Sequence, residues 1–177
     1  MLTKSEWDWE LGSRKIADTK QWHHRFNWVE EPYVSPNGEK IAAIVNQAEG
    51  EFNVCVNGDA WETVFDKIWY LRFAPDGRLT ALVSEMGEWT VAVDGTPWDN
   101  KFGYVWNLMF SPDGKNIAAA VQRDMSYCMA LNDVVWENTF PNMTHPTLSP
   151  DGTQTAAAVQ VAEFSEGEIH KFQQGAY

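Results

Sequence analysis

One motif occurs four times in this chain of 177 residues: a tryptophan, a phenylalanine four residues later, and a proline fourteen residues after the tryptophan. The copies are Trp22/Phe26/Pro36, Trp61/Phe65/Pro75, Trp98/Phe102/Pro112 and Trp136/Phe140/Pro150. Successive tryptophans are 39, 37 and 38 residues apart. A constant period of this size indicates a repeat architecture. We therefore expect a single domain over 1–177, with repeats at about 22–60, 61–97, 98–135 and 136–177.

Two turn motifs recur inside each repeat. The repeat proline is followed by Asn-Gly in the first copy and by Asp-Gly in the other three, and a second turn ends three residues before the next repeat tryptophan, at Asn57-Gly58, Asp94-Gly95 and Asn132-Asp133. Residues of these types adopt the positive φ angles that tight hairpins require. Strand-like segments lie between the turns, which predicts four strands per repeat. We call them A to D, with the proline turn joining A to B, the second turn joining C to D, and strand D running through the tryptophan and phenylalanine, as at 98–102.

Strand B has apolar or small residues at nearly every position, as in 41–45, 117–121 and 156–159. Such a strand is covered on both faces, because a solvated face would show alternating polar residues. A four-stranded antiparallel unit with both faces buried is typical of a β-propeller blade. The expected fold class is therefore all-β, a propeller of about four blades.

The third proline turn carries a family resemblance. The segment Phe110-Ser111-Pro112-Asp113-Gly114-Lys115-Asn116-Ile117-Ala118 resembles the WD40-like propeller repeats of the PD40 kind, in which a Ser-Pro-Asp-Gly turn precedes a basic residue and a small apolar strand. The resemblance covers roughly 22–160. The chain lacks the regular Gly-His and Trp-Asp dipeptides of true WD40 repeats, so no WD40 interaction residues are carried over.

The two ends of the chain raise the question of ring closure. The fourth copy continues through a strand C at 169–172 and then stops, while 22–26 would supply a strand D that completes this last blade. Residues 1–21 would then be an edge or closure segment, although 13–18 also have the composition of a strand C. Because one strand is then surplus, two alternatives stay open: two chains form one ring of about eight blades as a homodimer, or the surplus strand pairs at an edge.

The ten tryptophans fall into classes by position. The repeat tryptophans and phenylalanines are expected to be structural anchors that fill space between blades: Trp22, Trp61, Trp98, Trp136, Phe26, Phe65, Phe102 and Phe140. Trp28, Trp69 and Trp106 lie near the start of strand A, at a rim of the ring, where core packing and partner contact are both open. Trp7 and Trp9 precede the repeats and either cover a blade edge or dock on another chain. The candidate partner-binding residues are thus Trp7, Trp9, Trp28, Trp69 and Trp106.

The charge of the chain restricts its partners. With 13 basic and 25 acidic residues the formal net charge is −12. This surface repels nucleic acid, whose binding depends on clustered Lys and Arg, and it attracts basic proteins. No apolar stretch reaches the roughly 18 residues of a membrane span, and the N-terminus has no secretory signal pattern. We expect a cytoplasmic protein whose two cysteines, Cys55 and Cys128, are small buried hydrophobic residues.

Signatures of catalysis and of metal binding are scarce. There is no nucleophile elbow and no phosphate-binding loop, and Asp76, Asp113 and Asp151 are expected to be turn residues whose carboxylates bond their own backbone. His23 and His24 would point to opposite faces of a strand, so they do not form a chelating pair. We expect no catalytic residues, no metal and no cofactor.

These observations favour a non-catalytic protein-interaction subunit. A small, acidic, tryptophan-rich propeller resembles the tryptophan-rich D subunit of the transmembrane redox complex of sulfate-reducing bacteria, whose other subunits carry haems and iron-sulfur centres. The resemblance implies an accessory cytoplasmic subunit of a membrane-associated electron-transfer complex, which contacts the membrane only through that complex and whose partners are basic or redox-active proteins. The alternative is a propeller enzyme, a hydrolase or lyase, with its active site in the central channel.

Overall fold

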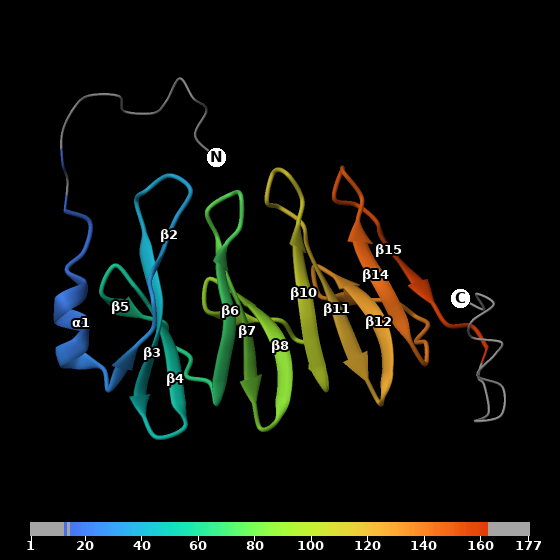
Figure 1. Cartoon of the computed structure of the whole chain (residues 1–177), viewed down its shortest axis with the longest axis horizontal. Coiled ribbons are helices and arrows are strands. Elements are labelled where there is room, and N and C mark those ends of the chain that lie inside the picture. Colours follow the sequence, from blue (N-terminus) through green and yellow to red (C-terminus); the bar gives the residue numbers. More distant parts are fainter. Residues whose placement is uncertain (1–12, 14, 163–177) are drawn as a thin grey trace. The chain divides into compact units, whose positions relative to one another are not determined.

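The computed structural model describes residues 13 and 15–162, and over these residues the chain is mostly antiparallel β-strand with one short helix (Figure 1). The expectation of a β-rich chain is confirmed. The chain divides into two compact units, one within residues 1–98 and the other within 99–177. Each unit is built from sheets that follow one another in the sequence.

The first unit contains the helix and two sheets (Figure 1). The helix α1 spans Thr19–Arg25, and the strands of the first sheet are β1 (Trp28–Val29), β2 (Tyr33–Val34), β3 (Ile41–Ala48), β4 (Glu51–Val56) and β5 (Asp59–Ala60). Their order is β1-β3-β4-β5, with β2 also paired to β3. The second sheet contains β6 (Lys67–Phe73), β7 (Leu79–Glu85), β8 (Glu88–Val93) and β9 (Thr96–Pro97), in sequence order.

The second unit also contains two sheets that are consecutive in the sequence. Its four-stranded sheet contains β10 (Tyr104–Phe110), β11 (Ile117–Arg123), β12 (Ser126–Leu131) and β13 (Val134–Val135), again in sequence order. It is followed by a pair, β14 (Met143–Leu148) and β15 (Thr155–Val159). The strand C expected at 169–172 lies outside the described residues.

Four strands per repeat are therefore found in the first three sheets, with strand A modified in each. In the first sheet strand A is split into β1 and β2 around Pro32, which cannot donate a backbone hydrogen bond. In the later copies strand A is continuous, but its register shifts at Tyr70, Asn107 and His145. Each of these residues has a positive φ, at 57°, 52° and 52°. A β-bulge thus recurs at one place in strand A and turns neighbouring side chains away from the sheet.

The expectation that strand D runs through the repeat tryptophan is wrong. Strand β9 ends at Pro97, before Trp98, and β5 ends at Ala60, before Trp61. The backbone N–H of Trp61 still donates to the Val54 carbonyl (2.9 Å), after which the chain leaves the sheet and returns only at Phe65. The interruption lets the Trp61 indole pack on Gly95 of the following sheet, where three ring atoms lie within 3.2 Å of an ideal Cβ position.

The two strands expected near the N-terminus are also not found. Residues 22–26 do not form a strand D, because Thr19–Arg25 is helical, and 15–18 form no strand C. Asp18 caps the helix, since its side chain accepts a hydrogen bond from the backbone N–H of Lys20 (3.3 Å). His23 and His24 accordingly lie in the last helical turn and not on opposite faces of a strand.

The motif spacing explains why the helix replaces a strand. Trp22 and Phe26 are four residues apart, which places them on one helical face, and both are buried against the first sheet. They pack with Ala43, Val45 and Cys55 from β3 and β4. The helix therefore covers the face of this sheet that does not meet the second sheet.

The cores lie between successive sheets within each unit. In the first unit Ala42, Ile44 and Val54 of the first sheet pack against Ile68 and Ala81 of the second. In the second unit the four-stranded sheet packs in the same way against β14 and β15. Strands β3, β7 and β11 are buried on both faces over most of their length, which confirms the prediction for strand B in three copies. The prediction is wrong for 156–159, because β15 alternates between half-buried and exposed residues. The cysteines are free thiols, and both are buried, as expected.

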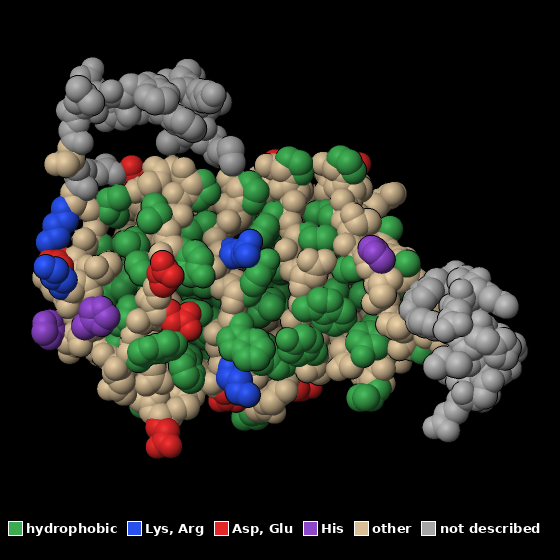
Figure 2. All heavy atoms as spheres, in the orientation of Figure 1, with side chains coloured by type: hydrophobic (Ala, Val, Ile, Leu, Met, Phe, Trp, Pro, Cys, Tyr) green, Lys and Arg blue, Asp and Glu red, His purple; other side chains and the backbone are tan. Residues whose placement is uncertain are grey.

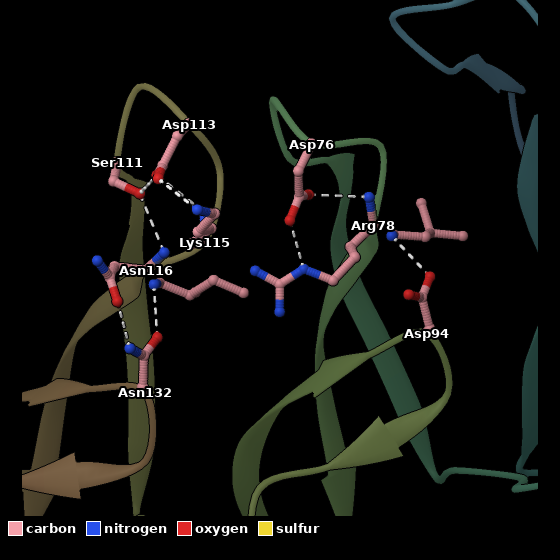
Figure 3. A network of polar contacts seen from close by, with 10 residues as sticks. Asp76, Arg78, Asp94, Ser111, Asp113, Lys115, Asn116 and Asn132 are labelled. Atoms are coloured by element: carbon pink, nitrogen blue, oxygen red, sulfur yellow. Dashed lines mark hydrogen bonds and ion pairs between the residues drawn. The ribbon is translucent and has the colours of Figure 1, made fainter. Parts of the chain in front are cut away.

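The proline turns are held by side chains. In the third copy the Ser111 hydroxyl donates to the Asp113 carboxylate (2.6 Å), and that carboxylate accepts from the backbone N–H of Lys115 (3.1 Å) (Figure 3). The second copy has Ala74 in place of the serine, and there Asp76 accepts from the backbone and the guanidinium of Arg78. The expectation that these aspartates bond their own turns is confirmed.

The second turn is fastened to strand B by its first residue. Asn57, Asp94 and Asn132 have φ of 53°, 47° and 47°. Each side-chain Oδ1 accepts the first backbone N–H of strand B of its own sheet, at 2.8 to 2.9 Å, as Figure 3 shows for Asp94 and Asn132. One Asn or Asp thus adopts the positive φ that the turn requires and also accepts a hydrogen bond from the first backbone N–H of strand B.

Candidate functional site

The repeat tryptophans differ in what they pack against: Trp22 lies between the helix and the first sheet, whereas Trp61 and Trp136 lie between sheets of their own units. Trp22 is only 2% exposed. Trp61 packs on Gly95, as described above, and the Trp136 indole N–H donates to the Thr155 hydroxyl (2.8 Å). Trp98 is half-buried. Of the motif phenylalanines, Phe26, Phe65 and Phe102 are buried and Phe140 is half-buried.

The tryptophans of strand A have different surroundings. Trp28 on β1 is 49% exposed and Trp69 on β6 is 51% exposed, so each presents about half of its side chain to solvent. Trp106 on β10 of the second unit is less exposed, because it contacts Tyr127 edge-on with ring centroids 5.8 Å apart. The neighbouring Tyr104 ring stacks on Trp106 at 6.1 Å and is 42% exposed. Trp7 and Trp9 lie outside the described residues.

Trp28 and Trp69 line the same cleft of the first unit. This Trp28–Trp69 cleft has a volume of about 440 Å³. Its lining residues come from four strands and the β1–β2 connection: Trp28, Glu30, Ile44, Asn46, Phe52, Lys67, Ile68 and Trp69. In Figure 2 hydrophobic side chains gather on the visible face over β1 and β6, next to acidic and basic side chains. The structure therefore brings together two of the five candidate partner-binding tryptophans.

Both indoles at the cleft contact other aromatic rings. Trp69 packs against Trp89 with ring centroids 4.8 Å apart and planes inclined by 38°, and Trp89 is buried. Trp28 contacts Phe52 edge-on, with centroids 6.5 Å apart. Such contacts restrict the rings before any ligand arrives, which lowers the entropy lost on binding.

The polar groups of the cleft differ in the hydrogen bonds that they make and in their exposure to solvent. The backbone N–H of Glu30 donates to the Ile44 carbonyl (2.9 Å), which fixes the position of this residue on the wall. Burial raises the pKa of the Glu30 carboxyl above its ordinary value. The Asn46 amide donates to the carbonyls of Ala48 (2.7 Å) and Glu51 (3.2 Å), so its donors are already used. Lys67 is exposed.

A second aromatic contact lies further along β6. The guanidinium carbon of Arg72 sits 4.0 Å from the centroid of the Tyr70 ring, which is the geometry of a cation–π interaction. Tyr70 is the left-handed residue of the strand A bulge. The bulge thus exposes an aromatic ring on the same strand as Trp69.

Six of the eight lining residues were not candidates from the sequence: Glu30, Ile44, Asn46, Phe52, Lys67 and Ile68. Trp89, which contacts Trp69 without lining the cleft, was not a candidate either. Glu30 follows Phe26 by four residues, and Trp69 follows Phe65 by the same number. Glu30 therefore occupies the repeat position at which the next copy has a tryptophan. That offset was a usable signal. The contact between Trp69 on β6 and Trp89 on β8 carries no local signal, because it depends on the pairing of β7 with both of these strands.

Within the described residues no group of three or more His, Cys, Asp or Glu side chains has the geometry to hold a metal ion. Over the same part of the chain, none of the helical structure combines the length and the apolar character that crossing a membrane requires. The sequence matches no protein-family model and no curated protein.

Proposed function

We propose that this chain is a protein-interaction subunit that acts by binding, and that the Trp28–Trp69 cleft is its docking site. The observation that carries the proposal is the pair of half-exposed, ring-supported indoles at one open cleft. Tryptophan is enriched among the residues that dominate binding energy at protein interfaces, especially where a pocket desolvates it. An exposed aromatic surface of this kind indicates an interaction site.

The proposed architecture is a β-propeller in which each four-stranded sheet is one blade. Support comes from the repeated strand order, the double burial of strand B and the face-to-face packing of sheets within each unit. In such a ring β1, which carries Trp28, and β6, which carries Trp69, would lie in strand A of two neighbouring blades. A second copy of the chain would complete a larger ring if one copy does not close on itself.

The proposed setting follows from the resemblance to the tryptophan-rich D subunit of a transmembrane redox complex. The chain would be an accessory subunit on the cytoplasmic side of a membrane-associated electron-transfer complex. Its net charge of −12 suits a basic partner, since complementary charge accelerates association and excludes acidic competitors. The redox groups would reside in the partner subunits.

The test is affinity capture from the native cells with the wild-type chain and a Trp69→Ala variant. A central indole at an interface contributes at least about 2 kcal/mol, so the affinity of the variant for the partner should be roughly 30-fold lower and its capture should fall accordingly. Met86→Ala is the matched control, because Met86 is 90% exposed at the tip of the β7–β8 hairpin and does not line the cleft. Circular dichroism verifies that both variants fold. Equal recovery of the same partner by wild type and Trp69→Ala would refute the docking site.

A further inference from the structure

We infer that the Trp28–Trp69 cleft receives a single arginine side chain of the partner, stacked on the indoles with its guanidinium paired to the Glu30 carboxylate. The inference rests on the proposed docking function and names the chemistry of the group that docks. It is carried by three features of the cleft lining: apolar side chains, two indoles and one acidic side chain.

The shape and polarity of the cleft suit arginine. Ile44, Phe52 and Ile68 supply apolar surface for the three methylene groups of the side chain. The indoles of Trp28 and Trp69 supply faces on which a planar guanidinium stacks. The chain already makes one such contact, since the Arg72 guanidinium lies 4.0 Å from the Tyr70 ring on the same strand as Trp69.

The charge of the cleft selects a cation. Glu30 is half-buried, and burial raises the pKa of its carboxyl. A partly desolvated carboxylate is unfavourable, and an incoming guanidinium supplies both a positive charge and paired hydrogen-bond donors. An apolar side chain would instead remove more water from the Glu30 carboxylate without supplying a charge or a hydrogen-bond donor.

The remaining polar side chains of the cleft do not prevent this arrangement. Lys67 has the same charge as the ligand, but it is exposed, and its four-carbon stem allows the ammonium to turn into solvent. Asn46 has its amide donors committed to the Ala48 and Glu51 carbonyls. Arginine is favoured over lysine because the guanidinium is flat and weakly hydrated, whereas the ammonium is a compact, strongly hydrated charge.

The test uses the full chain and a blocked tripeptide, N-acetyl-Gly-Arg-Gly amide, as the probe. Its neutral counterpart carries citrulline, which has nearly the same shape without the positive charge. Nuclear magnetic resonance follows the indole N–H signals, with those of Trp28 and Trp69 assigned from single Trp→Phe variants. We expect the arginine peptide to shift these two signals, and the citrulline peptide to bind at least about 10-fold more weakly, as the loss of a charge-assisted hydrogen bond predicts.

Two variants separate the role of Glu30 from general electrostatic attraction. Glu30→Gln should weaken arginine binding by about 5-fold to 10-fold. Glu31→Gln is the matched control, because Glu31 is the exposed neighbour of Glu30 and does not line the cleft. This control should leave the affinity within about 2-fold of wild type, as expected for a solvent-screened charge.

Three outcomes would overturn the inference. They are equal binding of the arginine and citrulline peptides, equal effects of Glu30→Gln and Glu31→Gln, and the absence of any shift at Trp28 and Trp69. If capture of the partner still depends on Trp69 in any of these cases, the docking function stands and only the arginine assignment fails. Conversely, peptide binding in the cleft together with unchanged capture by Trp69→Ala would support the arginine chemistry and refute the docking function.

Discussion

Substitution of Gly95 tests how the repeat tryptophan joins one sheet to the next. Gly95 has a φ of +87°, and an ideal Cβ built on it lies 3.0 Å from Cγ and 3.2 Å from Cδ1 and Cδ2 of Trp61. Gly95→Ala therefore has two costs, a left-handed backbone and a collision with the indole. The first is about 1–2 kcal/mol for an L-residue. The second is an overpacking cost of about 1–3 kcal/mol.

The same sheet contains a control for the backbone cost. Gly87 has a φ of +85°, and no atom lies within 4 Å of its Cβ position. Gly87→Ala should therefore lower the free energy of unfolding by the backbone cost alone. We expect Gly95→Ala to be more destabilising than Gly87→Ala by about 1–3 kcal/mol in urea unfolding.

A third variant assigns this difference to the indole. In a Trp61→Ala background the collision is absent, so Gly95→Ala and Gly87→Ala should then destabilise by the same amount within about 0.5 kcal/mol. Equal costs of the two substitutions in the wild-type background would refute the contact between Trp61 and Gly95. A difference that persists without the indole would refute our explanation of it.

Three further predictions follow from the packing and the turns. The Ser111 hydroxyl lowers the pKa of Asp113 below its ordinary value of 3.8. The stability that this carboxylate adds is therefore present above that value and is lost as the pH falls through the lower pKa of the folded state. Ser111→Ala should reduce this loss of stability at acid pH, measured by urea unfolding at several pH values. Burial raises the pKa of the Cys55 and Cys128 thiols, so neither should react with a disulfide reagent until the chain is unfolded in urea. Trp22→Ala should lower the free energy of unfolding by about 3–5 kcal/mol, because the side chain is almost fully buried.

Each of these predictions has a contrary result. If Ser111→Ala loses stability at acid pH as the wild type does, the Ser111 hydroxyl does not lower the pKa of Asp113. Fast labelling of either thiol in native buffer would contradict its burial. A loss below about 1 kcal/mol for Trp22→Ala would place the helix outside the cooperative core.

The turns were predictable from the sequence because their causes are local. The Pro-Asp-Gly turn and the turns at Asn57 and Asp94 depend on residues that adopt a positive φ more readily than others do. These residues recur at fixed positions within each repeat. Strand B was predictable for a similar reason, since its run of small and apolar residues allows no solvated face.

The N-terminal helix was not predictable from the motif alone. A Trp and a Phe four residues apart fit one face of a helix as well as they fit the interrupted strand D. What distinguishes Thr19–Arg25 from the later copies is its surroundings, because these residues cover an otherwise open sheet face instead of joining two sheets. Tertiary context of this kind overrides local propensity.

The cleft was predicted only in part. Trp28 and Trp69 were candidates because of their position in strand A, but Glu30 was not recognised. The cleft assembles residues from 28–30, 44–52 and 67–69, so it exists only once the two sheets pack. The bulge at Tyr70 was also unpredictable, since an aromatic residue is an unusual choice for a left-handed backbone.

The most direct test of the docking site is hydroxyl-radical footprinting of the chain, alone and with its captured partner, with oxidation of each tryptophan measured by mass spectrometry. In the free chain Trp28 and Trp69 should oxidise much faster than Trp22, in keeping with their exposures of 49%, 51% and 2%. The account predicts that the partner slows oxidation of Trp28 and Trp69. Protection confined to other residues, with both cleft tryptophans oxidised as fast as in the free chain, would contradict it.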